Sequence, residues 1–117
     1  HFWKEKITLA QKAGISSENI ILDPGMGGFL SSDPEVSFTV LRNLKTLKKE
    51  FSEYKILVGT WRKSFLREVS HATNPKKRLV ASLVSSLIAV QKGADILRVH
   101  DVTEMIEARK TWEAASF

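Results

Sequence analysis

The sequence predicts an α/β fold in which helices alternate with three parallel strands, in the order α-β-α-β-α-β-α, and two observations support it. Three short apolar segments, residues 20–22, 54–59 and 94–99, are bounded by polar or turn-forming residues, as is typical of buried strands. The segments between them carry apolar residues at spacings of three and four, which predicts amphipathic helices. Strands joined by helices run parallel, so the sheet belongs either to a doubly wound fold or to part of a (βα)8 barrel.

The first part of the chain predicts a helix, a strand and a glycine-rich loop. The helix spans residues 2–13 and ends at Gly14. Its buried face is predicted from apolar positions about one turn apart: Trp3, Ile7 and Ala10. The strand at 20–22 runs directly into the loop DPGMGGFLSS, which opens on an Asp-Pro-Gly turn.

The middle of the chain predicts one long helix and the second strand. Asp33 is a suitable N-cap, with Pro34 in the first helical position. The apolar face of this helix continues toward the strand at 54–59 through positions three or four apart: Phe38, Leu41, Leu44, Leu47 and Phe51.

The remaining segments predict helices on either side of the third strand. TWRKSFLREVS predicts a loop and a short helix, and NPKKR opens a longer helix that ends near Gly93. That longer helix has a leucine stripe: Leu79, Leu83 and Leu87. After the strand at 94–99, Asp101 and Glu104 have the spacing of a capping box for a last helix over 102–115.

The composition predicts one soluble globular domain, residues 1–117. The chain is 43% hydrophobic and 26% charged, and no apolar run reaches the roughly 18–20 residues that a membrane helix needs. It contains no cysteine, which excludes disulfides and thiolate metal sites and favours a cytoplasmic protein. Because the sequence does not start with Met and begins inside a predicted helix, we expect a cut or processed chain.

The charge balance favours anionic partners such as phosphates, nucleotides or nucleic acid. The formal net charge is +5 and the pI is about 9.6. Alternatively, the lysines of KTLKKE and NPKKR form a solvated surface. A nucleic-acid-binding module would need clustered basic residues beside exposed aromatic rings, but most aromatic residues here occupy helical core positions.

Polar side chains follow each predicted strand. Asp23 would either cap the glycine-rich loop or accept a pair of N–H bonds from a ligand. After the second strand come Arg62, which we expect to be a surface charge, and Lys63. Arg98 lies inside an apolar strand, so it needs an anionic partner, either Asp101 or a ligand. With His100 two residues on and Lys63 nearby, it predicts a phosphate-binding site.

Three motifs, ILDPGMG, LVGTWRKSFL and GADILRVHDVTE, together resemble the dihydropteroate synthase family. The resemblance implies the C-terminal part of a TIM barrel, with three of its parallel strands. It also implies an enzyme of folate biosynthesis and a sulfonamide target, which joins 6-hydroxymethyl-7,8-dihydropterin diphosphate to p-aminobenzoate. The products would be 7,8-dihydropteroate and diphosphate.

The resemblance also assigns roles to single residues. Asp23 would bind the aminopyrimidine edge of the pterin, and Lys63 would bind the pterin ring. Arg98 would pack on the pterin and hold the diphosphate together with His100, so that Lys63, Arg98 and His100 are the candidate catalytic residues. The family's Mg²⁺ would be bound by a residue absent from this chain, and a homodimer through the C-terminal helices is expected.

Two departures from the family pattern lie on the aminobenzoate side. Trp61 stands where the family usually has the Ser that helps to hold the aminobenzoate carboxylate. Gly28 stands where many members have Phe, and Phe29 would replace that ring by a shift of one position. We therefore expect altered aminobenzoate or sulfonamide binding, and no synthase activity of the 117 residues alone. Two alternatives remain open: a related pterin- or folate-dependent methyltransferase barrel, and a basic nucleic-acid-binding module.

Overall fold

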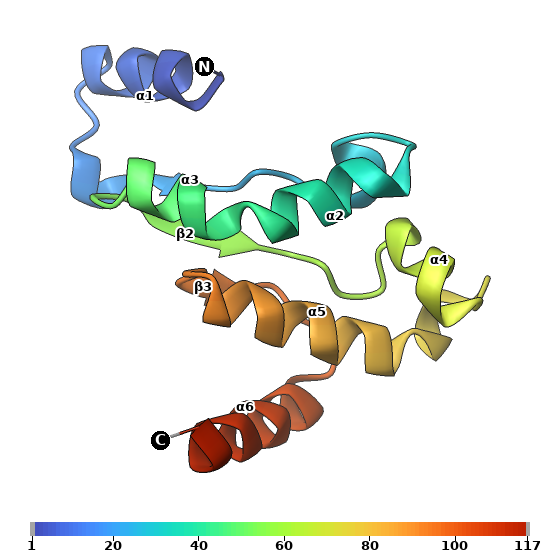
Figure 1. Ribbon diagram of the computed structural model, residues 1–117. Coiled ribbons are helices and arrows are strands. Elements are labelled where there is room, and N and C mark those ends of the chain that lie inside the picture. The colour runs from blue at the N-terminus through green and yellow to red at the C-terminus, as the bar shows by residue number, and fades with distance from the viewer. Residues whose placement is uncertain (1, 117) are drawn as a thin grey trace.

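The computed structural model describes residues 2–116 and contains a three-stranded parallel sheet in the order β1-β2-β3 (Figure 1). β1 (Ile21–Leu22) pairs with β2 (Lys55–Val58), which pairs with β3 (Ile96–Leu97). The predicted strands and their parallel direction are confirmed. Each strand is shorter than the apolar segment that predicted it: two, four and two residues of the three segments form the backbone pairing of the sheet.

Six α-helices accompany this sheet in the described residues. They are α1 (Phe2–Lys12), α2 (Pro34–Arg42), α3 (Leu44–Glu50), α4 (Arg67–Ser70), α5 (Leu79–Gln91) and α6 (Val102–Ser116). Within residues 2–116, no helix combines the length and apolar character required to cross a membrane.

Two helix boundaries differ from the prediction. The helix expected to run from Asp33 to Phe51 is two helices, interrupted at Asn43, whose side-chain amide donates to the Thr39 carbonyl at 2.8 Å. α5 begins only at Leu79, because the preceding turn at 75–77 is a separate 3₁₀ turn. The predicted N-cap is confirmed, since the Asp33 carboxylate accepts the backbone N–H of Glu35 at 3.0 Å.

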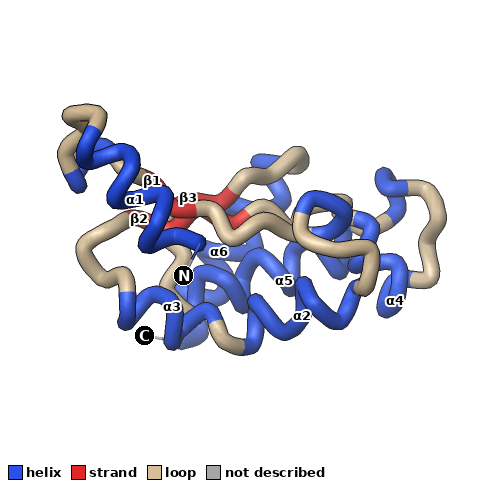
Figure 2. Tube along the Cα trace, turned by 90° about the horizontal axis from the view of Figure 1, so that it is seen from above, coloured by secondary structure: helices blue, strands red, loops and turns tan. Residues whose placement is uncertain are grey.

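The two faces of the sheet differ in burial. The register places Leu22, Ile56, Val58 and Leu97 on one face, where they pack into the core. Figures 1 and 2 show α2, α3 and α5 lying along one side of the sheet. On the other face, Ile21 is 51% exposed, and Leu57 and Ile96 are only partly buried. A doubly wound sheet carries helices on both faces, whereas a barrel wall carries them on one, so this segment has the arrangement of a barrel wall.

The buried face of α5 is not the leucine stripe that the sequence suggests. Its buried residues are small or polar: Ser82, Ser85, Ser86 and Ala89. Leu83 and Leu87 instead line the space between α5 and α6, opposite Trp112. The serines allow the segment that follows β2 to approach α5 closely and to form hydrogen bonds with it: Thr60 bonds to both Ser85 and Ser86.

Candidate functional site

The polar residues predicted at the strand ends meet at one edge of the sheet. Asp23 after β1, Lys63 after β2 and Arg98 after β3 line one cavity of about 340 Å³. The remaining lining residues belong to the same loops and to the start of α1: Phe2, Pro24, Gly25, Met26 and Gly59. Three segments far apart in the sequence therefore place one carboxylate and two cations around a common space.

Asp23 holds the turn that follows β1. Its Oδ1 accepts the backbone N–H of Gly25 at 2.8 Å, and Gly25 has a positive φ of 77°. The turn-capping role considered from the sequence is thus present. It does not exhaust the carboxylate, because two ionised oxygens offer about four acceptor positions.

The glycine-rich loop supports Lys63. Gly27 has a φ of 61°, and its N–H donates at 2.8 Å to the hydroxyl of the buried Ser37 on α2. A Cβ at Gly27 would lie 3.3 Å from the Cβ of Lys63. The loop therefore packs on the base of the lysine side chain. Ser37 was not singled out from the sequence, and a single serine on an otherwise amphipathic helix gives no signal of this contact.

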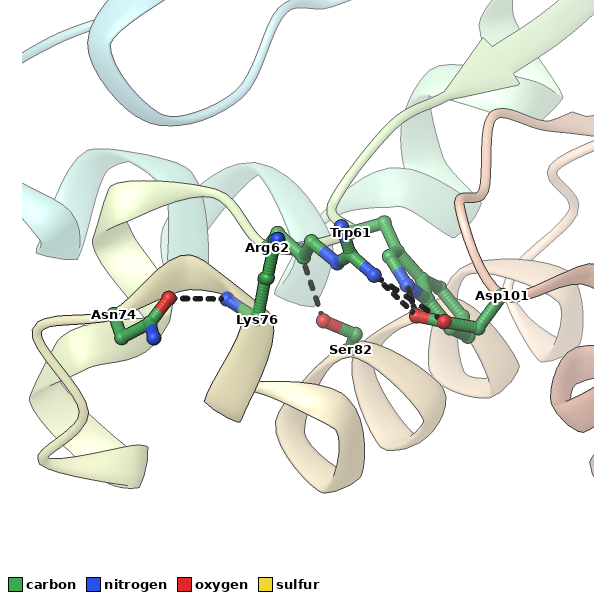
Figure 3. Close-up of polar contacts among 6 residues, drawn as sticks. All are labelled: Trp61, Arg62, Asn74, Lys76, Ser82 and Asp101. Carbon is green, nitrogen blue, oxygen red and sulfur yellow. Dashed lines mark hydrogen bonds and ion pairs between the residues drawn. The ribbon is translucent and has the colours of Figure 1, made fainter.

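Arg62 is not the surface charge that the sequence suggested. Its Nη2 contacts both carboxylate oxygens of Asp101 at 3.2 Å, and its side chain is only 26% exposed. Asp101 was expected either to pair with Arg98 or to cap α6. Its carboxylate instead accepts from Arg62 and from the indole N–H of Trp61, the latter at 2.7 Å (Figure 3).

These contacts set the charge of Asp101. The hydrogen bond from Trp61, assisted by the charge and hydrogen bonds of Arg62 and by the charge of His100, lowers the pKa of Asp101. Desolvation opposes these effects but does not outweigh them. Asp101 is therefore ionised at neutral pH and balances the charge of Arg62.

Arg98 and His100 lie beyond the end of β3. The strand ends at Leu97, and both side chains are exposed, so Arg98 does not carry the cost of desolvation that its apolar surroundings in the sequence implied. The backbone of Arg98 remains bonded to β2, since its backbone N–H donates to the Val58 carbonyl at 3.1 Å. The absence of a side chain at Gly59 lets Arg98 pack there, 3.4 Å from where a Cβ would lie. His100 does not line the cavity.

The residues expected on the aminobenzoate side occupy different environments. Trp61 is 3% exposed and lies in the protein interior, with its N–H bonded to Asp101. Gly28 is exposed, and nothing lies within 4 Å of where its Cβ would be. The side chain of Phe29 lies outside the described part of the structure.

The cavity does not suit a divalent cation. Its charged residues are one carboxylate and two cations, whereas Mg²⁺ requires several oxygen ligands. Among residues 2–116, no group of three or more His, Asp or Glu side chains is placed to hold a metal ion. No magnesium chemistry is therefore assigned to these residues.

Known proteins are similar to this chain over most of its length. The family model described as "Pterin binding enzyme" matches residues 1–100. Among curated relatives, dihydropteroate synthase type-3 from Escherichia coli is 42% identical over 113 residues, which is 97% of this chain and 42% of that protein. The chain thus spans about two fifths of the length of this relative.

Solved structures show the same similarity. The dihydropteroate synthase of Xanthomonas albilineans in complex with 7,8-dihydropteroate superposes with a TM-score of 0.90 at 32% identity, covering 97% of this chain and 42% of that one. The same enzyme with 4-aminobenzoic acid gives a TM-score of 0.90 at 32% identity, covering 97% and 40%. The expected fold class, three parallel strands of a TIM barrel with their helices, is confirmed.

Proposed function

The chain belongs to the pterin-binding enzyme family, and on this premise we propose that it supplies part of the active site of a dihydropteroate synthase. Such an enzyme joins 6-hydroxymethyl-7,8-dihydropterin diphosphate to p-aminobenzoate. The observation that carries this proposal is the cavity in which Asp23, Lys63 and Arg98 meet at the carboxyl ends of three parallel strands. Ligand sites of barrel enzymes lie at this end.

Asp23 and Lys63 would bind the pterin. An ionised carboxylate accepts two parallel N–H bonds, which suits the aminopyrimidine edge of a pterin. The Gly25 N–H fixes the orientation of this carboxylate before a ligand arrives. Lys63, supported at its base by Gly27, would donate to the ring from the second strand. Because these protein groups already lie around the cavity before the pterin binds, binding costs less conformational entropy.

Arg98 and His100 would bind the diphosphate. The amine nitrogen of p-aminobenzoate attacks the methylene carbon of the pterin while the C–O bond to diphosphate breaks. The electrons of that bond remain on the diphosphate oxygen, and the nitrogen loses a proton. A guanidinium fork on the leaving oxygens stabilises the charge that develops there. Because His100 lies outside the cavity lined by Arg98, we place the distal phosphate near His100.

The aminobenzoate side of the site is expected to differ from the family pattern. Trp61 supplies no hydroxyl where the family usually has Ser, and its indole N–H is already bonded to Asp101 at 2.7 Å. We propose that p-aminobenzoate and sulfonamides bind with altered affinity while pterin recognition is retained. We call the longest natural chain that contains these 117 residues the parent protein. If the parent protein bound sulfonamides as tightly as family members with the usual Ser do, this proposal would be contradicted.

Three further parts of the proposal concern the parent protein. Any Mg²⁺ would be bound by residues outside this chain, since the cavity described here is cationic. The parent protein would lie in the cytoplasm. It would form a homodimer through the C-terminal helices.

An apolar stripe on α5 supports the dimer proposal. Val80, Val84 and Ile88 follow one another at intervals of one turn and are 73%, 51% and 36% exposed. They border a cavity of about 820 Å³ between α2, α4 and α5. A second copy brings the same stripe, so that pairing buries apolar surface on both sides.

Light scattering tests the dimer. Val84→Glu should shift the parent protein from dimer to monomer, while Leu9→Glu, at a 60% exposed site on α1, should not. A monomeric wild-type protein would refute the dimer.

The main proposal is tested with substrates. The parent protein should release diphosphate only when the pterin diphosphate and p-aminobenzoate are both present, and the isolated 117 residues should show no turnover. Turnover by the isolated chain would refute the inactivity. If calorimetry instead showed that the parent protein binds methyltetrahydrofolate and not the pterin diphosphate, the methyltransferase alternative would replace the proposal.

A further inference from the structure

Lys63 is carried by an unusual turn. The Lys63 N–H donates to the Thr60 carbonyl at 3.1 Å, which closes a β-turn with Trp61 and Arg62 at its centre. Arg62 has a φ of 57°, a backbone conformation that residues other than glycine and asparagine seldom adopt. Such a residue persists only where its surroundings hold it in place. The contacts of this turn therefore decide where Lys63 lies.

One side of the turn is held by α5 and the residue before it. The backbone N–H of Arg62 donates to the Ser82 hydroxyl at 2.9 Å. The Arg62 carbonyl accepts from the guanidinium of Arg78 at 2.9 Å, and Arg78 is 5% exposed. Arg78 also donates to the carbonyls of Ala72 and Thr73, so its guanidinium joins the turn to the loop that precedes α5. These contacts fix the backbone of the turn but not its position relative to β3.

The other side is held by Asp101. Its carboxylate accepts from both central residues of the turn, from Trp61 at 2.7 Å and from Arg62 at 3.2 Å, and all three side chains converge in Figure 3. Asp101 directly follows His100 and lies three residues after Arg98. One carboxylate thus joins the segment that carries Lys63 to the segment that carries the two candidate phosphate ligands.

We propose that Asp101 is a positioning residue of the site: by bonding to Trp61 and Arg62 it fixes the turn bearing Lys63 against the end of β3 bearing Arg98 and His100. This inference rests on the proposed pterin diphosphate site. It also gives Trp61 a role, because its indole N–H supplies one of the bonds that Asp101 accepts from the turn. Arg62 is neutralised by the same carboxylate and adds no further positive charge to the cavity.

The chain offers a matched control for Asp101. Asp95 precedes β3 as Asp101 follows it, and its carboxylate bonds to Lys48 at 2.7 Å and to the backbone N–H of Ile56 on β2 at 2.9 Å. The two aspartates are similarly exposed, 34% for Asp95 and 28% for Asp101. Asp95→Asn and Asp101→Asn therefore each remove one charge that ties β3 to a neighbour, but only Asp101 touches the turn that carries Lys63.

The first experiment compares these variants in the parent protein. Both substitutions should lower the melting temperature by similar amounts. Calorimetry should show the Kd for the pterin diphosphate raised about fivefold or more by Asp101→Asn and less than about twofold by Asp95→Asn. Arg62→Lys, which keeps the charge, should lose less affinity than Arg62→Met. Equal affinities of the two aspartate variants would overturn the inference while leaving the proposed function intact.

The second experiment does not depend on a ligand. Amide and indole hydrogen exchange is followed by NMR in the parent protein, with Trp61→Phe used to identify the Trp61 indole signal. Asp101→Asn should speed exchange of this indole proton and of the Lys63 amide about tenfold, whereas Asp95→Asn should leave both unchanged. An unchanged Lys63 amide in Asp101→Asn would overturn the inference even if the wild-type protein bound no pterin, an outcome that would separately refute the proposed function.

Discussion

Lys48 and Asp95 form an ion pair at the amino end of β3, with 2.7 Å between Nζ and Oδ2. The same carboxylate oxygen accepts the N–H of Ile56, and Lys48 also donates to the Tyr54 carbonyl at 2.9 Å. The pair therefore joins α3, the start of β2 and the residue before β3. It lies at the end of the sheet opposite the cavity, so it contributes to stability without contacting the proposed site.

Asp95→Asn should lower the free energy of unfolding of the parent protein by about 1 kcal/mol. The estimate is modest because the side chains of Lys48 and Asp95 are 27% and 34% exposed, and water screens their attraction. Urea denaturation measures the change. Glu50→Gln is the control, since Glu50 pairs with Lys4 at 3.3 Å where both side chains are at least half exposed, and it should change stability by less than about 0.5 kcal/mol. Equal effects of the two substitutions would contradict the prediction.

The contribution of Asp95 should depend on pH in one direction. Desolvation raises the pKa of Asp95, but the hydrogen bonds from Lys48 and Ile56 and the charges of Lys48 and Lys55 together lower it below its ordinary value. A carboxyl whose pKa is lower in the folded state stabilises that state above the unfolded pKa, about 3.9, and loses this contribution as the pH falls through the folded pKa. The difference in unfolding free energy between wild type and Asp95→Asn should thus be constant from pH 7 to about pH 5 and shrink below about pH 4. A difference that grew on acidification would show the opposite sign.

The parts of the fold set by local chemistry were predictable from the sequence. The Asp33 cap and the turn after Asp23 depend on residues two positions apart, and both are present. The break at Asn43 was missed because the apolar spacing runs unbroken across it. The side-chain bond from Asn43 to Thr39 interrupts the helix without changing that spacing.

Three of the residues that the sequence places at the strand ends line one cavity, but the hydrogen-bond partners around it could not be predicted from the sequence. Strand order alone brings Asp23, Lys63 and Arg98 together, because parallel strands end at one edge. The choice of Arg62 over Arg98 as the partner of Asp101 depends on the positive φ of Arg62 and on the orientation of Trp61. Neither is encoded in residue spacing, since both follow from how the turn packs on α5.

Asp23→Asn should weaken binding of the pterin diphosphate by about 10- to 100-fold. Asparagine can still accept the Gly25 N–H and keep the turn, but it lacks the second acceptor oxygen and the charge that the aminopyrimidine edge requires. Calorimetry on the parent protein measures the loss. Asp33→Ala serves as control, because it removes a helix cap worth about 1 kcal/mol without touching the cavity. Loss of binding in the control alone would place the pterin elsewhere.

His100→Asn should weaken binding of diphosphate less than Arg98→Met does. Arg98 lines the cavity, whereas His100 lies outside it and would contact only the distal phosphate. We expect a loss of about threefold for His100→Asn and about tenfold or more for Arg98→Met, measured as competition by inorganic diphosphate. His71→Asn is the matched histidine control. His71 is also exposed, and its φ of 54° is one that asparagine tolerates, so affinity should be unchanged. A larger effect from His100 than from Arg98 would reverse the assignment of the two phosphates.

Gly27→Ala should reduce both stability and pterin affinity, and Gly14→Ala should reduce stability alone. Both glycines have positive φ, 61° and 91°, so alanine at either position costs about 1 kcal/mol of backbone strain. Nothing lies within 4 Å of a Cβ at Gly14, whereas a Cβ at Gly27 would press on Lys63 at 3.3 Å. The lysine must then shift by a few tenths of an ångström, and its donor moves away from the ring that it would bind. Melting temperatures and pterin diphosphate affinities of the two variants in the parent protein separate the effects. If Gly27→Ala bound the pterin as tightly as Gly14→Ala, the contact between the glycine-rich loop and Lys63 would not matter for pterin binding.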